Sequence, residues 1–222
     1  MVAALVAASL LPWAAGTAHA APVVTVNGPL ELLNLGTGNG DGFQNSNPIT
    51  FDHSDKINFL NTAPPTSPVA GLYSGTVTNV AVSPLAGNAN YLVAQPGEEV
   101  QMLFSGLQTS FGLLWGSIDA YNTLEFFNTA VSSINPEFTL TGSQVLGLLG
   151  PGAVAGTTQA DVMIKGLEFN EVVAVDSNNP AFEFAPDPVP EPASLALLGL
   201  GLIGLGMVRY VAKKRPSSAT PA

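Results

Sequence analysis

The chain has 222 residues, no cysteine and a formal net charge of −10 at pH 7. The absence of cysteine excludes disulfides, thiolate nucleophiles and cysteine-based zinc sites, and the negative charge excludes electrostatic attraction to nucleic acid. Apolar residues make up 46% of the sequence and charged residues 10%, so the chain is not globally disordered. This length supplies one domain with a core, together with terminal appendages.

The first 20 residues are typical of a signal peptide. An apolar run from Val2 to Leu11 is followed by small residues that end in Ala18-His19-Ala20, an A-x-A cleavage pattern. The run is too short to span a membrane, and no basic residue precedes it. We therefore expect signal peptidase to cleave after Ala20, with a buried N-terminal helix as the alternative.

Residues 21–184 are predicted to form an exported β-domain. Short runs that alternate apolar and polar residues, separated by Gly, Pro and Asn, are typical of strands joined by turns. The predicted strands are 23–26, 56–60, 73–82, 98–104, 109–116, 122–127, 160–166, 168–175 and 181–184. Residues 141–150 are predicted to form a helix, with Thr141 or Ser143 as its N-cap and Gly150-Pro151 at its end. The pattern predicts an all-β fold, an antiparallel two-sheet sandwich of the jelly-roll kind.

The clearest alternation lies on two consecutive predicted strands. Their apolar side chains share one face of each strand: Phe111, Leu113, Trp115, Leu124 and Phe126. The segment between the strands, "SIDAYN", contains the Asp and Asn expected of a connection. We expect a hairpin in which Trp115 is a core residue and Tyr121 a turn residue.

The body contains few candidates for catalysis or metal binding. His53 is the only histidine after residue 20, and no G-x-S-x-G motif accompanies it, so we expect a solvated side chain. Calcium is a candidate ligand for the oxygen-rich segment 37–47 and for Asp52 and Asp55, although the D-x-[DN]-x-[DN]-G spacing is absent. Such residues are equally typical of ordinary turns.

Asp119 and Glu125 are candidate carboxylates for glycoside hydrolysis. Nothing in their spacing fixes the separation of about 5 to 9 Å that this chemistry requires. We therefore expect no enzyme activity, no catalytic residue, no metal and no cofactor.

Positive charge is concentrated at the C-terminus. Residues 21–189 contain 15 acidic and two basic side chains, a net charge of −13. Residues 193–212 form an apolar, glycine-rich run that would be about 30 Å long as a helix, the hydrocarbon thickness of a bilayer. We expect a transmembrane helix there and a basic cytoplasmic tail at 213–222. The stop-transfer residues are Arg209, Lys213, Lys214 and Arg215.

Residues 185–192 precede the apolar run and are rich in proline. Such a segment is expected to form an extended stalk that joins neither a helix nor a central strand. Within it, Val189-Pro190-Glu191-Pro192 stands before the apolar run and the basic cluster. These three features, in this order, resemble the PEP-CTERM sorting signal.

The resemblance implies processing by exosortase, a membrane-embedded peptidase-like enzyme of Gram-negative bacteria. The expected precursor is anchored in the inner membrane with its body outward. The expected product lies at the cell surface or in the extracellular matrix. An ordinary C-terminal anchor is the alternative interpretation.

The body also resembles a family of exosortase-dependent surface proteins, chiefly through "WGSIDAYN" at 115–122. That resemblance implies a secreted β-sandwich linked to exopolysaccharide production and biofilm formation. The predicted function is a non-enzymatic surface or matrix protein, with extracellular polysaccharide as a partner. One alternative is a carbohydrate-binding module that uses exposed Tyr91, Trp115 or Tyr121; another is a glycan-acting hydrolase.

Overall fold

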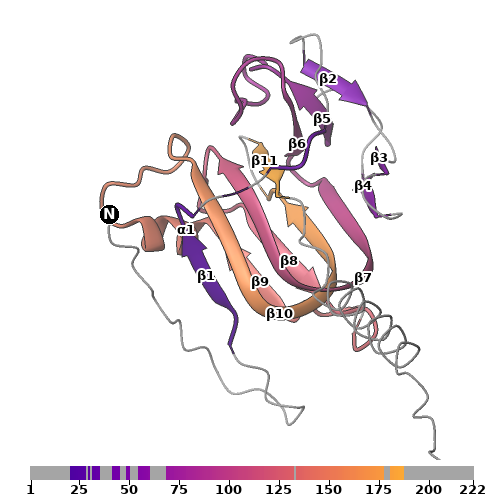
Figure 1. Cartoon of the computed structure of the whole chain (residues 1–222). Helices are drawn as coiled ribbons and strands as arrows, with labels where there is room; N and C mark the ends of the chain where they lie inside the picture. The colour runs from indigo at the N-terminus through magenta and orange to yellow at the C-terminus, as the bar shows by residue number, and fades with distance from the viewer. Residues whose placement is uncertain are drawn as a thin grey trace, which may run out of the picture. The chain divides into compact units, whose positions relative to one another are not determined.

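The computed structural model describes residues 21–28, 30, 32–35, 42–45, 49–50, 55–60, 69–132, 134–177 and 181–187 (Figure 1). All of them belong to a first unit, Met1–Val189. The described elements are β1 (Val23–Val26), β2 (Gly42–Asn45), β3 (Ile49–Thr50), β4 (Lys56–Leu60), β5 (Gly71–Ser74), β6 (Asn90–Ala94), β7 (Glu99–Gly116), β8 (Thr123–Phe127), β9 (Phe138–Thr141), α1 (Gly142–Leu149), β10 (Ala160–Val175) and β11 (Phe182–Pro186). The fold is mostly β, as the sequence predicts.

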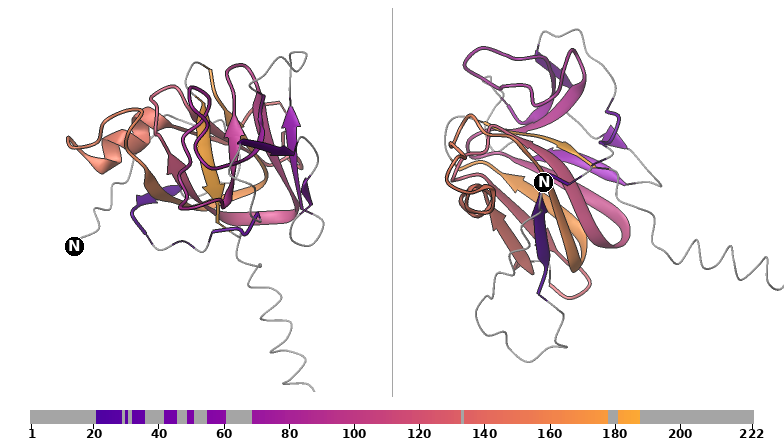
Figure 2. Two further views of the ribbon diagram at one scale, coloured as in Figure 1. Left: turned by 90° about the horizontal axis from the view of Figure 1, so that it is seen from above. Right: turned by 60° about the vertical axis from the view of Figure 1, so that its left-hand side comes forward.

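The strands of the described residues form one hydrogen-bonded sheet in which every pair of strands is antiparallel. The path through the sheet is β2-β5-β6-β11-β7-β10-β8-β9. Three strands lie off this path, because β1 pairs with β10, β3 pairs with β4, and β4 pairs with β7. The sheet curls strongly, and the two long strands β7 and β10 run side by side around the curl (Figures 1 and 2).

The structure does not confirm the predicted two-sheet sandwich. The two long strands, β7 and β10, continue through the bend, so both arms of the fold belong to one hydrogen-bonded sheet. The sequence predicts breaks at 105–108 and at 167, whereas β7 and β10 are continuous there, with 18 and 16 residues. Ser105, Gly106 and Gln108 at the first point, and Gly166 beside the second, interrupt the apolar alternation in a way that is typical of a turn. Instead, the β7–β10 register shifts between Lys165 and Glu171, and Gly166 adopts a φ of 81° that favours glycine. A β-bulge of this kind bends a strand without ending it.

The core lies inside the curl and is built from the alternating residues of both arms. Four phenylalanine rings, Phe104, Phe111, Phe126 and Phe169, pack edge to face with centroids 5.2 to 6.4 Å apart. This edge-to-face arrangement matches the charge distribution of aromatic rings. The side chains that the sequence places on the buried faces of 109–116 and 122–127 are all buried, which confirms that prediction.

Helix α1 confirms the predicted helix and identifies its N-cap. The Thr141 hydroxyl accepts from the backbone N–H of Gln144, and the Gln144 side chain accepts from the backbone N–H of Thr141, which completes a capping box. Ser143 is not the cap, since its hydroxyl donates to the carbonyl of Ala120. Gly150 follows the helix with a φ of 88°.

Two predicted boundaries are wrong. The predicted strand 73–82 ends at Ser74 in β5, and turns with an isolated bridge between Val77 and Ala81 follow. The predicted stalk begins too early, since β11 continues through Pro186, which pairs with Leu113 of β7. Proline is accommodated there because the pairs between β11 and β6 end at Phe184, so no donor is needed on that side.

Candidate functional site

The segment Trp115–Asn122, which carries the resemblance of the body, links β7 to β8. These two strands do not form the predicted hairpin, because β10 lies between them in the sheet. Strands adjacent in sequence usually pair, which is why the sequence predicts a hairpin here. Trp115 is fully buried and stacks on Phe182, with ring centroids 4.6 Å apart. The prediction of Trp115 as a core residue is confirmed.

The backbone of this segment is fixed from two sides. The N–H of Ile118 donates to the carbonyl of Thr158 at 2.8 Å, and the N–H of Gly142 donates to the carbonyl of Asn122 at 2.8 Å. A Cβ on Gly142 would lie 1.9 Å from the carbonyl oxygen of Asp119. The segment therefore packs against the start of α1 more closely than any side chain would allow.

The segment contributes one buried carboxylate, Asp119, which interacts electrostatically with the buried Glu183, as does Asp176, and we call Asp119, Asp176 and Glu183 the acidic cluster. Their exposed fractions are 7%, 0% and 1%. The pKa of Glu183 is raised to about 8, chiefly by burial and also by the negative charges of Asp119 and Asp176. A hydrogen bond of 2.8 Å from the backbone N–H of Val82 acts in the opposite direction and lowers the pKa. The neutral acid of Glu183 is therefore the main form below about pH 8.

Asp119 and Tyr121 interact within the same segment. Burial raises the pKa of the Asp119 carboxyl, and its hydrogen bond with Tyr121 opposes the shift. Burial, and then the Asp119 carboxylate, raise the pKa of the Tyr121 phenol. Among the described residues, Asp119 Oδ2 and Glu183 Oε2 have no hydrogen-bond partner, a costly arrangement for ionised oxygens in the protein interior.

The predicted carboxylate pair for glycoside hydrolysis is divided between different surroundings. Asp119 belongs to the acidic cluster and interacts with Tyr121. Glu125 lies on β8, where burial and then the charge of Glu99 raise its pKa. The acidic cluster is itself buried, so a bulky glycan would not reach Asp119 without opening the fold.

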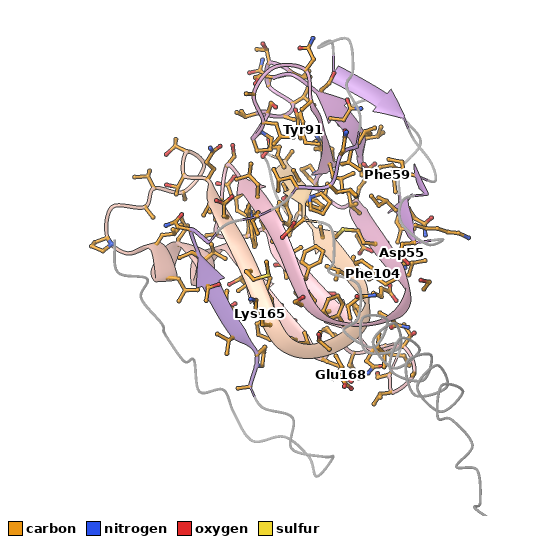
Figure 3. The ribbon with its side chains drawn as sticks, in the orientation of Figure 1. Asp55, Phe59, Tyr91, Phe104, Lys165 and Glu168 are labelled. Carbon is orange, nitrogen blue, oxygen red and sulfur yellow. The ribbon has the colours of Figure 1, made fainter. Side chains whose placement is uncertain are left out.

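Asp55 has a structural partner at the bend of β7. Its Oδ1 accepts from the backbone N–H of Ser105 at 2.6 Å, and the residue is 7% exposed (Figure 3). Asp52 and His53 lie outside the described residues, as does most of the segment 37–47. Within the part of the chain that the structure describes, no group of three or more His, Asp or Glu side chains is placed to hold a metal ion.

The aromatic side chains considered for sugar stacking are mostly internal. Tyr91 and Trp115 have no exposed surface, and the Tyr91 hydroxyl donates to the carbonyl of Gly75 at 2.7 Å (Figure 3). Tyr121 is partly exposed. A ring must present a free face to stack on a sugar, so Tyr91 and Trp115 are unavailable for that role.

A polar row on the outer face of the sheet is not among the predicted site residues. The Asn58 amide donates to Gln101 at 2.9 Å, and the Gln101 amide donates to Glu171 at 2.7 Å, across β4, β7 and β10. The alternation of 56–60, 98–104 and 168–175 places these side chains opposite the core. The pairing that brings them together depends on strand order, which no local pattern contains.

The remaining predicted site residues lie outside the described residues. These are Ala18, Ala20, Val189, Pro190, Glu191, Pro192, Arg209, Lys213, Lys214 and Arg215. The predicted span at 193–212 also lies outside them, and no helix within them is long and apolar enough to cross a membrane.

Comparison with known families identifies one motif. The PEP-CTERM protein-sorting motif matches residues 188–209, which include Val189-Pro190-Glu191-Pro192 and end at Arg209. No curated protein and no solved structure matches the chain. The sorting signal predicted from the tail is therefore confirmed, and it implies an exported, surface-directed protein that exosortase processes.

Proposed function

Because the chain carries a PEP-CTERM sorting motif, we propose that it is a non-enzymatic protein of the cell surface or extracellular matrix of a Gram-negative bacterium. In this proposal the body contributes to exopolysaccharide or biofilm structure after the tail has directed its sorting. The match at residues 188–209 is the observation that carries the proposal.

The proposed route has two processing steps. Signal peptidase removes residues 1–20, and the apolar run at 193–212 then holds the precursor in the inner membrane with Lys213, Lys214 and Arg215 in the cytoplasm. Hydrocarbon burial contributes about 0.8 kcal/mol per CH₂, so such a helix does not leave the bilayer spontaneously. Cleavage near Pro190-Glu191-Pro192 is therefore the step that separates the body from the membrane.

The positions of the carboxylates argue against the alternative of a glycan-acting hydrolase. The members of the acidic cluster are buried, and the Glu171 carboxylate on the outer face accepts a hydrogen bond from Gln101. Neither arrangement presents two free carboxylates across a cleft, which glycoside hydrolysis requires.

Two variants test the sorting step in a host that carries an exosortase. Replacing Pro190-Glu191-Pro192 with three alanines leaves the apolar run and basic cluster unchanged, so a longer, membrane-bound form should accumulate. Deleting residues 193–222 should give the opposite result, a soluble body that is not sorted. If the alanine variant were processed and released at the parent rate, the sorting function would be contradicted, and the tail would be an ordinary membrane anchor.

The proposed polysaccharide partner is tested separately from sorting. A glycan array probed with the processed protein, with and without calcium, measures binding directly. Binding that survives substitution of Tyr121, the partly exposed aromatic of the three considered, would require a surface other than the predicted one.

A further inference from the structure

The end of β11 is held within the fold, close to the start of the sorting motif. The N–H of Asp187 donates to the carbonyl of Gly112 on β7 at 2.8 Å. The carbonyl of Pro186 accepts from the N–H of Leu33 at 2.7 Å. Asp187 is only 8% exposed. The chain is therefore bound to the body up to Asp187, one residue before the matched motif begins.

Gly112 allows this close packing. A Cβ at this position would lie 2.7 Å from Asp187 Oδ2 and 2.8 Å from Asp187 Cβ. Separations under 3 Å between such atoms require movement, and here the obstacle is Asp187, the residue that directly follows β11. Asp187 can therefore pack against residue 112 only because that residue has no side chain.

Little chain separates this contact from the sorting motif. Three peptide units join Asp187 to Pro190, and a trans chain of that length reaches at most about 11 Å. An enzyme that recognises Pro190-Glu191-Pro192 must therefore work within that distance of the docked strand end. Enzymes that read extended peptides commonly pair with the peptide backbone over several residues, but the backbone at 185–187 is already paired with β7 and Leu33.

We propose that the body limits its own processing: exosortase acts on the chain when the end of β11 is released from β7. This inference rests on the proposed sorting function and concerns its regulation. Release requires only the loss of the contacts at Pro186 and Asp187, a local opening that costs less than global unfolding. The fraction of molecules with a released strand end then sets the processing rate.

The first test lengthens the link without changing any described residue. A flexible Gly-Ser linker of about six residues inserted between Asp187 and Pro188 adds roughly 13 Å of root-mean-square reach. In a pulse-chase experiment with the full-length precursor, we expect processing to accelerate about tenfold, which corresponds to about 1.4 kcal/mol. A linker variant processed at the parent rate or more slowly would overturn the proposal.

The second test weakens the docked end itself. Gly112→Ala should accelerate processing, whereas Gly147→Ala, the same change at a helical position with no atom within 4 Å of the new Cβ, should leave the rate unchanged. Equal rates for both glycine variants and the parent would count against the proposal. If Gly112→Ala does not fold, the linker variant still decides the outcome, because the body is unaltered in it.

The two failures can be told apart. Normal processing of the triple-alanine variant would contradict the proposed sorting function, whatever the processing rate of the linker variant. Blocked processing of that variant, combined with an unchanged processing rate for the linker variant, would support the sorting function and contradict only the proposed control by β11.

Discussion

The Glu183 side chain accepts a hydrogen bond of 2.8 Å from the backbone N–H of Val82, and the residue is only 1% exposed. Glu183 lies on β11 between Phe182 and Phe184, both fully buried. The other members of the acidic cluster, Asp119 and Asp176, add negative potential. A buried strand between two partner strands therefore contains an acid that the fold favours in its neutral form.

The stability of the body should fall as pH rises from about 4.5 to about 8. The pKa of Glu183 is raised from 4.5 to about 8 on folding, so the folded state retains a proton that the unfolded state releases in this window. Each pKa unit corresponds to about 1.4 kcal/mol, which predicts a loss of several kcal/mol across the window. Denaturant unfolding at a series of pH values measures the effect.

Glu183→Gln should flatten that dependence, since an amide keeps an acceptor oxygen and does not titrate. Glu168→Gln is the matched control, because Glu168 is exposed on β10. If Glu183→Gln and the parent lose stability equally between pH 5 and pH 8, the acid responsible is not Glu183.

Asp55→Ala should destabilise the body by about 1–3 kcal/mol, because the backbone N–H of Ser105 loses its acceptor at the bend of β7. Asp55→Asn keeps an acceptor oxygen and should cost less. Thermal unfolding of both variants and the parent, with and without a chelator, provides the measurement. We expect the chelator to leave all three melting temperatures unchanged; a drop confined to the parent would assign Asp55 to a calcium site.

Thr141→Ala should destabilise the body by about 1 kcal/mol, because helix α1 loses its capping box. Ser143→Ala is the matched control, since the Ser143 hydroxyl donates to a loop carbonyl and caps nothing. Urea midpoints of the two variants discriminate between them. A larger effect at Ser143 than at Thr141 would contradict the assignment of the cap.

Local patterns in the sequence predict part of the local structure, whereas strands β2, β3, β6 and β9 are not predicted. The segments 23–26 and 56–60 coincide with β1 and β4, and residues 141–150 contain α1. Strand β6 is missed because all five of its side chains are buried, so the polar alternation that marks a strand is absent.

Local sequence patterns predict neither the order of the strands nor the acidic cluster. Asp119, Asp176 and Glu183 come from separate segments that only the completed sheet brings together. The motif "AFEF" around Glu183 shows an acid between two aromatic residues, which is typical of a strand with one solvated face. Here both faces are covered, and that burial depends on residues far away in the chain.

The position of β11 has a consequence for how the chain folds after export. β11, the last strand of the body, pairs with residues 92–94 of β6 on one side and with residues 113–116 at the end of β7 on the other. Such long-range pairing folds slowly. Until residue 187 has crossed the membrane, β6 and β7 thus keep edges able to pair with another chain, which makes late translocation the step at which aggregation competes with folding.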